Sequence, residues 1–103
     1  MKFFKSSDFT GDRAWAALDL SVVEGASVRV HWTDEPYKWH VNDGNEVFVV
    51  LEGQVRMFFK QGGETEQHMM GAGSICVAEE GDEHVAHPQG AARVLVIEKV
   101  GSI

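Results

Sequence analysis

Short runs of β-branched and aromatic residues, broken by glycine, asparagine and aspartate, dominate the sequence. In two of the runs apolar and polar residues alternate with a period of two, the pattern of strands with one buried face. The breaks have turn chemistry. Many short strands at regular spacing are typical of a β-sandwich or barrel, so the sequence predicts an all-β protein. The expected strands lie around 28–32, 46–51, 55–59, 75–78 and 94–97.

Three local features leave more specific expectations. Residues 8–18 contain helix formers, but Gly11 interrupts them, and a strand around 15–20 fits equally well. Gly53 stands between two apolar runs with almost no spacer, which predicts a tight hairpin. A turn at 42–45 is expected to fold the chain back, so that Glu46 begins the partner strand.

Composition excludes several classes of protein. The 103 residues suit a single domain, and 9 Lys+Arg against 16 Asp+Glu give a net charge of −7. Such an acidic chain lacks the basic surplus that nucleic acids or anionic membranes attract. No signal peptide or membrane span is visible, so a cytoplasmic location is the expectation. The single cysteine, Cys76, is expected to be a buried structural thiol.

Polar residues with ligand chemistry gather in two stretches. In an extended strand His40 and Asn42 point to the same face, and Glu46 follows a turn that can bring it to the same side. His84 follows a strand and a Gly turn, and it can approach the others if the sheet closes. Taken singly, His40 and His84 are better explained as core residues satisfied by backbone groups; their combination with Glu46 favours a ligand role.

These stretches resemble the two sequence motifs of the cupin superfamily. Around 34–53 the pattern G-x5-H-x-H-x3,4-E-x6-G is read here as Asp34, His40, Asn42, Glu46 and Gly53. Around 73–88 the pattern G-x5-P-x-G-x2-H-x3-N is read as Gly73, Glu79, Gly81, His84 and Pro88. The chain departs from the motifs at four of these positions: Asp34, Asn42, Glu79 and Pro88.

The resemblance implies one cupin-like domain over 1–103, an antiparallel β-barrel of jelly-roll type with a pocket inside. It also implies a divalent metal held by His40, Asn42, Glu46 and His84. Imidazole and carboxylate ligands suit Fe, Mn, Ni and Zn alike, whereas the neutral amide of Asn42 is a weaker ligand. In a metal-free form the same groups would hydrogen-bond a polar ligand, or Glu46 would act as an acid or base.

The pocket is expected to continue from the site onto apolar side chains. Phe48 and Val50 share the parity of Glu46, and Met57 is expected to join them from a neighbouring strand. Alternatively, these side chains fill the barrel solidly. Of the other histidines, His31 is expected on the opposite, wetter face of its strand, and His68 is expected to be a solvated strand residue. His87 is three residues after His84, so period-two alternation is expected to point it away from His84.

The functional expectation is a small metal-binding cupin that acts on or binds a small oxygenated molecule. If it is an enzyme, the resemblance implies an isomerase, dioxygenase or lyase. The alternative is a non-catalytic small-ligand binding or sensing module without an essential metal. Exposed strand edges and the apolar residues at 3–4 favour a homodimer.

Overall fold

The computed structural model describes residues 1–102 and is almost entirely β, which confirms the expected class. A single 3-10 turn, η1 (Ser6–Asp8), precedes the strands. The strands are β1 (Ala16–Val23), β2 (Ala26–Thr33), β3 (His40–Val41), β4 (Glu46–Glu52), β5 (Val55–Gln61), β6 (Glu64–Met70), β7 (Ile75–Ala78), β8 (Glu83–Pro88) and β9 (Ala92–Lys99).

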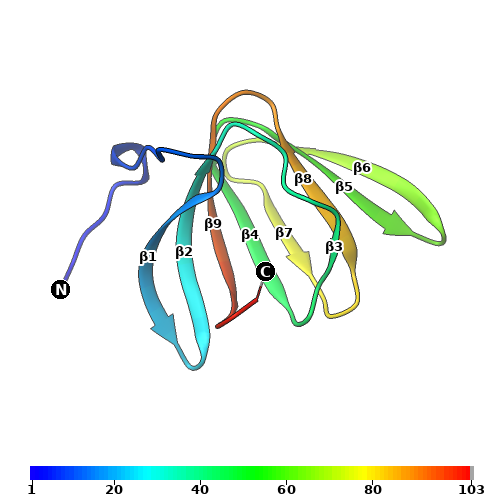
Figure 1. Cartoon of the computed structure of the whole chain (residues 1–103), viewed down its shortest axis with the longest axis horizontal. Coiled ribbons are helices and arrows are strands. Elements are labelled where there is room, and N and C mark those ends of the chain that lie inside the picture. Colours follow the sequence, from blue (N-terminus) through cyan, green and yellow to red (C-terminus); the bar gives the residue numbers. More distant parts are fainter. Residues whose placement is uncertain (103) are drawn as a thin grey trace.

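The strands form two antiparallel sheets that face each other (Figure 1). One sheet has the strand order β1-β2-β9-β4-β7, and the other has the order β3-β8-β5-β6. Strands distant in sequence are therefore neighbours, since β9 lies between β2 and β4. The arrangement is jelly-roll-like, and the two sheets do not close into a complete barrel.

The core lies between the two sheets and follows from the period-two pattern of the strands. On β4, Phe48 and Val50 point inward and lie opposite Val96 and Val94 of β9. Side chains of the facing sheet complete the same cluster. Its buried members are Phe48, Val50, Val55, Met57, Met70, Ala86, Ala92, Val94 and Val96.

The tight hairpin expected at Gly53 is not formed, because β4 and β5 belong to different sheets. The chain instead crosses from one sheet to the other there. Gly53 has a φ of +81°, and a Cβ at this position would lie 2.5 Å from the carbonyl oxygen of Ala91. Only glycine combines that backbone conformation with such a close approach.

The turn at 42–45 also connects the two sheets, so the expectation that Glu46 pairs with the preceding strand is wrong. Glu46 pairs with Ala78 of β7 and Glu98 of β9, whereas His40 pairs with His84 of β8. The turn nevertheless brings the two segments to the same interior, since their side chains face each other across the space between the sheets.

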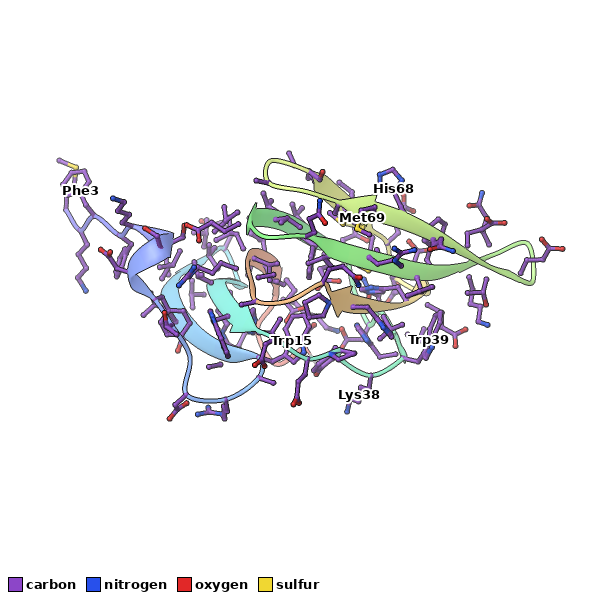
Figure 2. The ribbon with its side chains drawn as sticks, turned by 90° about the horizontal axis from the view of Figure 1, so that it is seen from above. Phe3, Trp15, Lys38, Trp39, His68 and Met69 are labelled. Atoms are coloured by element: carbon purple, nitrogen blue, oxygen red, sulfur yellow. The ribbon has the colours of Figure 1, made fainter. Side chains whose placement is uncertain are left out.

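The amino-terminal region resolves the ambiguity at 8–18 in favour of a strand. β1 begins at Ala16, and before it only η1 is helical within residues 1–102. None of the helical structure in that range is long and apolar enough to cross a membrane. Phe3 stands away from both sheets and is 90% exposed (Figure 2).

Candidate metal centre

His40 and His84 lie directly opposite each other on adjacent antiparallel strands. β3 and β8 pair His40 with His84, and their ring centroids are 4.5 Å apart. Two backbone hydrogen bonds hold the end of this short ladder: Asn42 N–H donates to the Asp82 carbonyl at 2.8 Å, and Gly81 N–H donates to the Asn42 carbonyl at 2.9 Å. Backbone pairing therefore fixes the spacing of the two imidazoles.

Glu46 reaches the histidines from the other sheet. It is the first residue of β4, its side chain is buried, and its Oε1 lies 3.2 Å from Nε2 of His84. The ligand atoms of His40, Glu46 and His84 all lie within 4.8 Å of one another. Three residues on three strands of two sheets thus converge on one point.

Asn42 is buried within this cluster. Its Oδ1 accepts a hydrogen bond from Nε2 of His84 at 2.7 Å, and its Nδ2 donates to Glu46 Oε1 at 3.4 Å. The amide therefore satisfies both the imidazole and the carboxylate. The structure places all four residues expected at the site, His40, Asn42, Glu46 and His84, in one contiguous group.

The donor atoms around His84 are spaced like adjacent ligands of a first-row divalent ion. Nitrogen and oxygen ligands lie about 2.0–2.2 Å from such an ion, so ligands in adjacent positions are about 3 Å apart. The separations of 2.7 Å and 3.2 Å around His84 Nε2 match that spacing. His40 Nδ1 donates to the Lys38 carbonyl at 3.0 Å, which leaves its Nε2 lone pair free for a ligand bond.

Two carboxyl groups in the site have perturbed pKa values of opposite direction. Burial alone raises the pKa of Glu46, but the hydrogen bond and charge of His84 and the hydrogen bond from Asn42 bring it below its usual value. Burial, together with the charge of Glu46 and a hydrogen bond to it, raises the pKa of Glu98 to about 7. Cross-strand pairing of Glu46 with Glu98 explains this coupling.

Two cavities flank His84. The smaller, of about 210 Å³, is lined by all three ligand candidates, His40, Glu46 and His84, and by Phe48. The larger, of about 540 Å³, lies toward β5, β6 and β7 and contacts the cluster only through His84. The smaller cavity is therefore the one associated with the metal-ligand geometry, although the other is larger.

The three residues expected to line one pocket are distributed differently. Phe48 lines the smaller cavity and Met57 lines the larger one, where its Sδ lies 3.3 Å from Nδ1 of His84. Val50 is fully buried in the core and lines neither cavity.

The expectation that His31 faces away from the site is wrong. His31 and Arg29 both line the smaller cavity. The apolar alternate residues of β2 lie on the outer face of the sheet, where Val30 is covered to 4% exposure. Both faces of this strand are thus covered, so alternation alone does not identify the inner one.

Aromatic residues hold His31 in place. Its Nδ1 donates to the Trp15 carbonyl at 3.2 Å, and its ring packs edge-on against the Trp15 indole, which in turn packs on Tyr37. Trp15 has a φ of 59°, unusual for a large residue, and its Nε1 donates to the Glu35 carbonyl at 2.9 Å. Burial lowers the pKa of His31, which keeps it neutral at neutral pH.

Sequence reasoning missed Arg29 and Glu98 as cavity residues. Each side chain points toward the space between the sheets, but which face of each strand is the inner one follows only from the pairing of β2 and β4 with β9.

Two further histidines lie away from the metal-ligand cluster. His87 packs on Phe58 and lies outside the smaller cavity, and His68 lines the larger cavity. Burial raises the pKa of the Cys76 thiol, which disfavours the nucleophilic thiolate.

Comparison of the sequence with protein-family models and with curated proteins finds no match. Similarity appears at the level of structure. A cupin-2 domain containing protein from Shewanella frigidimarina superimposes with a TM-score of 0.77 and 22% identity, over 90% of this chain and 86% of that one. A cupin superfamily protein from Desulfitobacterium hafniense has a TM-score of 0.77 and 10% identity, over 92% and 86%.

A larger enzyme contains a similar domain. Hydroquinone 1,2-dioxygenase in complex with Fe³⁺ superimposes with a TM-score of 0.76 and 19% identity, over 87% of this chain and 29% of the enzyme chain. At these identities the likeness concerns the arrangement of strands. Together with the two facing antiparallel sheets, it shows that this chain has the cupin fold.

Proposed function

We propose that the protein binds one divalent metal ion through His40, Glu46 and His84, with Asn42 beside the ion. A small oxygenated molecule would then bind in the adjoining cavity of about 210 Å³. The observation that carries this proposal is the convergence of three ligand atoms within 4.8 Å from three strands. Two imidazoles and one carboxylate are the ligand set of non-haem iron sites with open positions.

The residues around the ion have distinct tasks. His40 keeps Nε2 available because Nδ1 is held by the Lys38 carbonyl. To bind a metal through Nε2, His84 would have to give up the Nε2 proton that it donates to Asn42. The neutral ring would then carry its proton on Nδ1, which lies 3.3 Å from Met57 Sδ, a weak acceptor. Glu46 is already ionised and supplies the negative charge.

When bound, the metal supplies Lewis acidity toward the oxygen atoms of the small molecule. Fe, Mn, Ni and Zn all suit this donor set. The presence of Fe³⁺ in the structurally similar hydroquinone 1,2-dioxygenase supports iron as one of these ions. An isomerase, dioxygenase or lyase reaction is compatible with such a centre.

A second function is a binding or sensing module without an essential metal. The observation that favours it is the hydrogen bonding of Asn42, which accepts from Nε2 of His84 and donates to Oε1 of Glu46, so that the polar groups satisfy one another. In that case the four side chains would bind a polar ligand directly, with Glu46 available as an acid or base.

Metal analysis separates the two functions. Wild-type protein should carry about one equivalent of transition metal, and the double variant His40→Ala with His84→Ala should lose it. The matched control is His68→Ala with His87→Ala, which alters the same number of histidines outside the cluster and should retain the metal. Equal metal in both double variants, or none in the wild type, contradicts the metal proposal.

Catalysis needs its own test. The metal-loaded protein should be incubated with small sugars, β-diketones and phenolic acids, and products measured by mass spectrometry. Turnover that disappears in the ligand variant supports an enzyme. Metal binding without turnover across the panel favours the binding module.

We further propose a homodimer with no nucleic-acid or membrane partner, formed by a single domain in the cytoplasm. β7 is an edge strand whose outer residues Ile75 and Val77 are 65% and 68% exposed, and Phe3 adds apolar surface. Burying such surface favours self-association. Light scattering at micromolar concentration should give twice the chain mass, and a monodisperse monomer contradicts the dimer.

A further inference from the structure

We propose that the cavity of about 210 Å³ takes a small carboxylate, whose anionic group pairs with the guanidinium of Arg29. This assignment names the class of small molecule for the proposed site and rests on that proposed function for the metal end of the cavity. Binding of the carboxylate by the Arg29 guanidinium can be tested whether or not a metal binds.

Arg29 and the metal-ligand residues open into the same space. Arg29 lies on β2 and lines the cavity together with His40, Glu46 and His84, which come from three other strands. Trp15 and Tyr37 form part of the wall. The cavity wall therefore combines a cationic side chain, a cluster of metal-ligand type and apolar side chains, the mixture that orients small molecules.

The cavity volume suits a small occupant. Pockets for drug-sized ligands have volumes of about 300–1,000 Å³. The cavity of about 210 Å³ is smaller, which matches a compact carboxylate.

Arg29 has an incomplete set of partners inside the protein. Among residues 1–102 its ion-pair partner is Asp19, whose Oδ1 lies 2.7 Å from Nε. The buried Nε nevertheless has no hydrogen-bond partner, so its N–H does not point at that oxygen. The Asp19 side chain is 77% exposed, so water weakens this pair. A guanidinium has five N–H donors, and a planar carboxylate can accept two of them side by side.

Positive charge would lie at two places on the cavity wall. Arg29 lines it, and a divalent ion held by His40, Glu46 and His84 would add positive charge at those residues. The acidic groups beside them are Glu46, Glu98 and Asp19. A carboxylate bound between the ion and the guanidinium would contact both cations directly.

The test compares malonate with its neutral diamide, malonamide, by calorimetric titration into Zn²⁺-loaded protein. The wild type should bind malonate at least tenfold more tightly than malonamide. Arg29→Gln should weaken malonate binding at least tenfold and leave malonamide affinity and zinc content unchanged. Methylphosphonate, a tetrahedral anion, should bind more weakly than malonate.

Asp19→Asn is the matched control because it breaks the same ion pair from the other side. If Arg29 only served the ion pair, both variants would behave alike. We expect Asp19→Asn to bind malonate as tightly as the wild type or more tightly. If Arg29→Gln does not fold, Arg29→Lys, which keeps the charge and loses the planar fork, should weaken malonate binding by a similar factor.

Several results would overturn the assignment: equal affinity for malonate and malonamide, unchanged malonate binding in a folded Arg29 variant, or tighter binding of methylphosphonate. Failure of the proposed metal function would look different, since zinc would then not bind at all. In that case malonate is titrated into the metal-free protein and followed by NMR, and binding that depends on Arg29 still supports the carboxylate.

Discussion

Glu98 is the carboxyl group within residues 1–102 whose pKa is raised furthest, to about 7. It lies beside Glu46 on the neighbouring strand, and a carboxylate there would be half-buried next to another negative charge. The group therefore keeps its proton up to a pKa of about 7 in the folded chain. The unfolded chain releases that proton near the ordinary glutamate pKa of about 4.3.

This difference predicts a pH-dependent stability in the metal-free protein. Between about pH 4.5 and pH 7 the folded state binds more protons than the unfolded state, so stability falls as the pH rises. Glu98→Gln removes this loss. After allowance for the partial exposure of the group, the variant should gain about 1 kcal/mol relative to wild type between pH 5 and pH 8.

Urea unfolding in EDTA at the two pH values measures the effect. Glu64→Gln on the exposed strand β6 is the control, and it should follow the wild type at both pH values. An identical pH dependence in wild type and Glu98→Gln would show that Glu98 is not protonated in the folded protein.

At the scale of elements, two crossings between the sheets build the site. The turn at 42–45 places β3 in one sheet and β4 in the other, and the crossing at Gly53 does the same for β4 and β5. β4 is thereby fixed at both ends, with Glu46 at its first position and Phe48 and Val50 along its inner face. The backbone conformation at these two crossings therefore fixes the position of the Glu46 carboxylate.

Gly53 is the residue through which this can be tested. Gly53→Ala should destabilise the protein by about 3 kcal/mol, because it forces a side chain into a left-handed conformation and against the Ala91 carbonyl. Gly62→Ala is the control. Gly62 also has a positive φ, of 60°, but a Cβ there would meet open space, so the cost should be about 1 kcal/mol.

Urea unfolding of both variants gives the comparison. Equal losses of stability would mean that backbone conformation alone matters and that the approach to Ala91 adds nothing. A larger loss at Gly62 would contradict the account of the crossing.

At the scale of the whole molecule, a metal ion would join the two sheets. His40 and His84 belong to one sheet and Glu46 to the other. An ion that binds only the folded chain stabilises it by about 2.7 kcal/mol at a hundred times its Kd. For a domain of this size that corresponds to a rise in Tm of about 10 °C or more.

Thermal unfolding with and without EDTA should show this rise in the wild type. The double variant His40→Ala with His84→Ala should melt at the same temperature in both conditions, and His68→Ala with His87→Ala should respond like the wild type. A wild-type Tm that is insensitive to EDTA, in protein first loaded with metal, would contradict a site that spans both sheets.

The sequence by itself determined the all-β class and the positions of the turns, and its resemblance to the cupin motifs predicted the four residues of the candidate cluster. Strand periodicity and turn chemistry are local properties, and the spacing of His40, Glu46 and His84 in the motifs can be counted directly in the sequence. Tertiary structure alone decided which sheet each strand joins, which face of β2 is inward, and that Arg29 and Glu98 share the cavity. These depend on long-range pairing with β9, and a strand covered on both faces carries no local signal of which face meets the site.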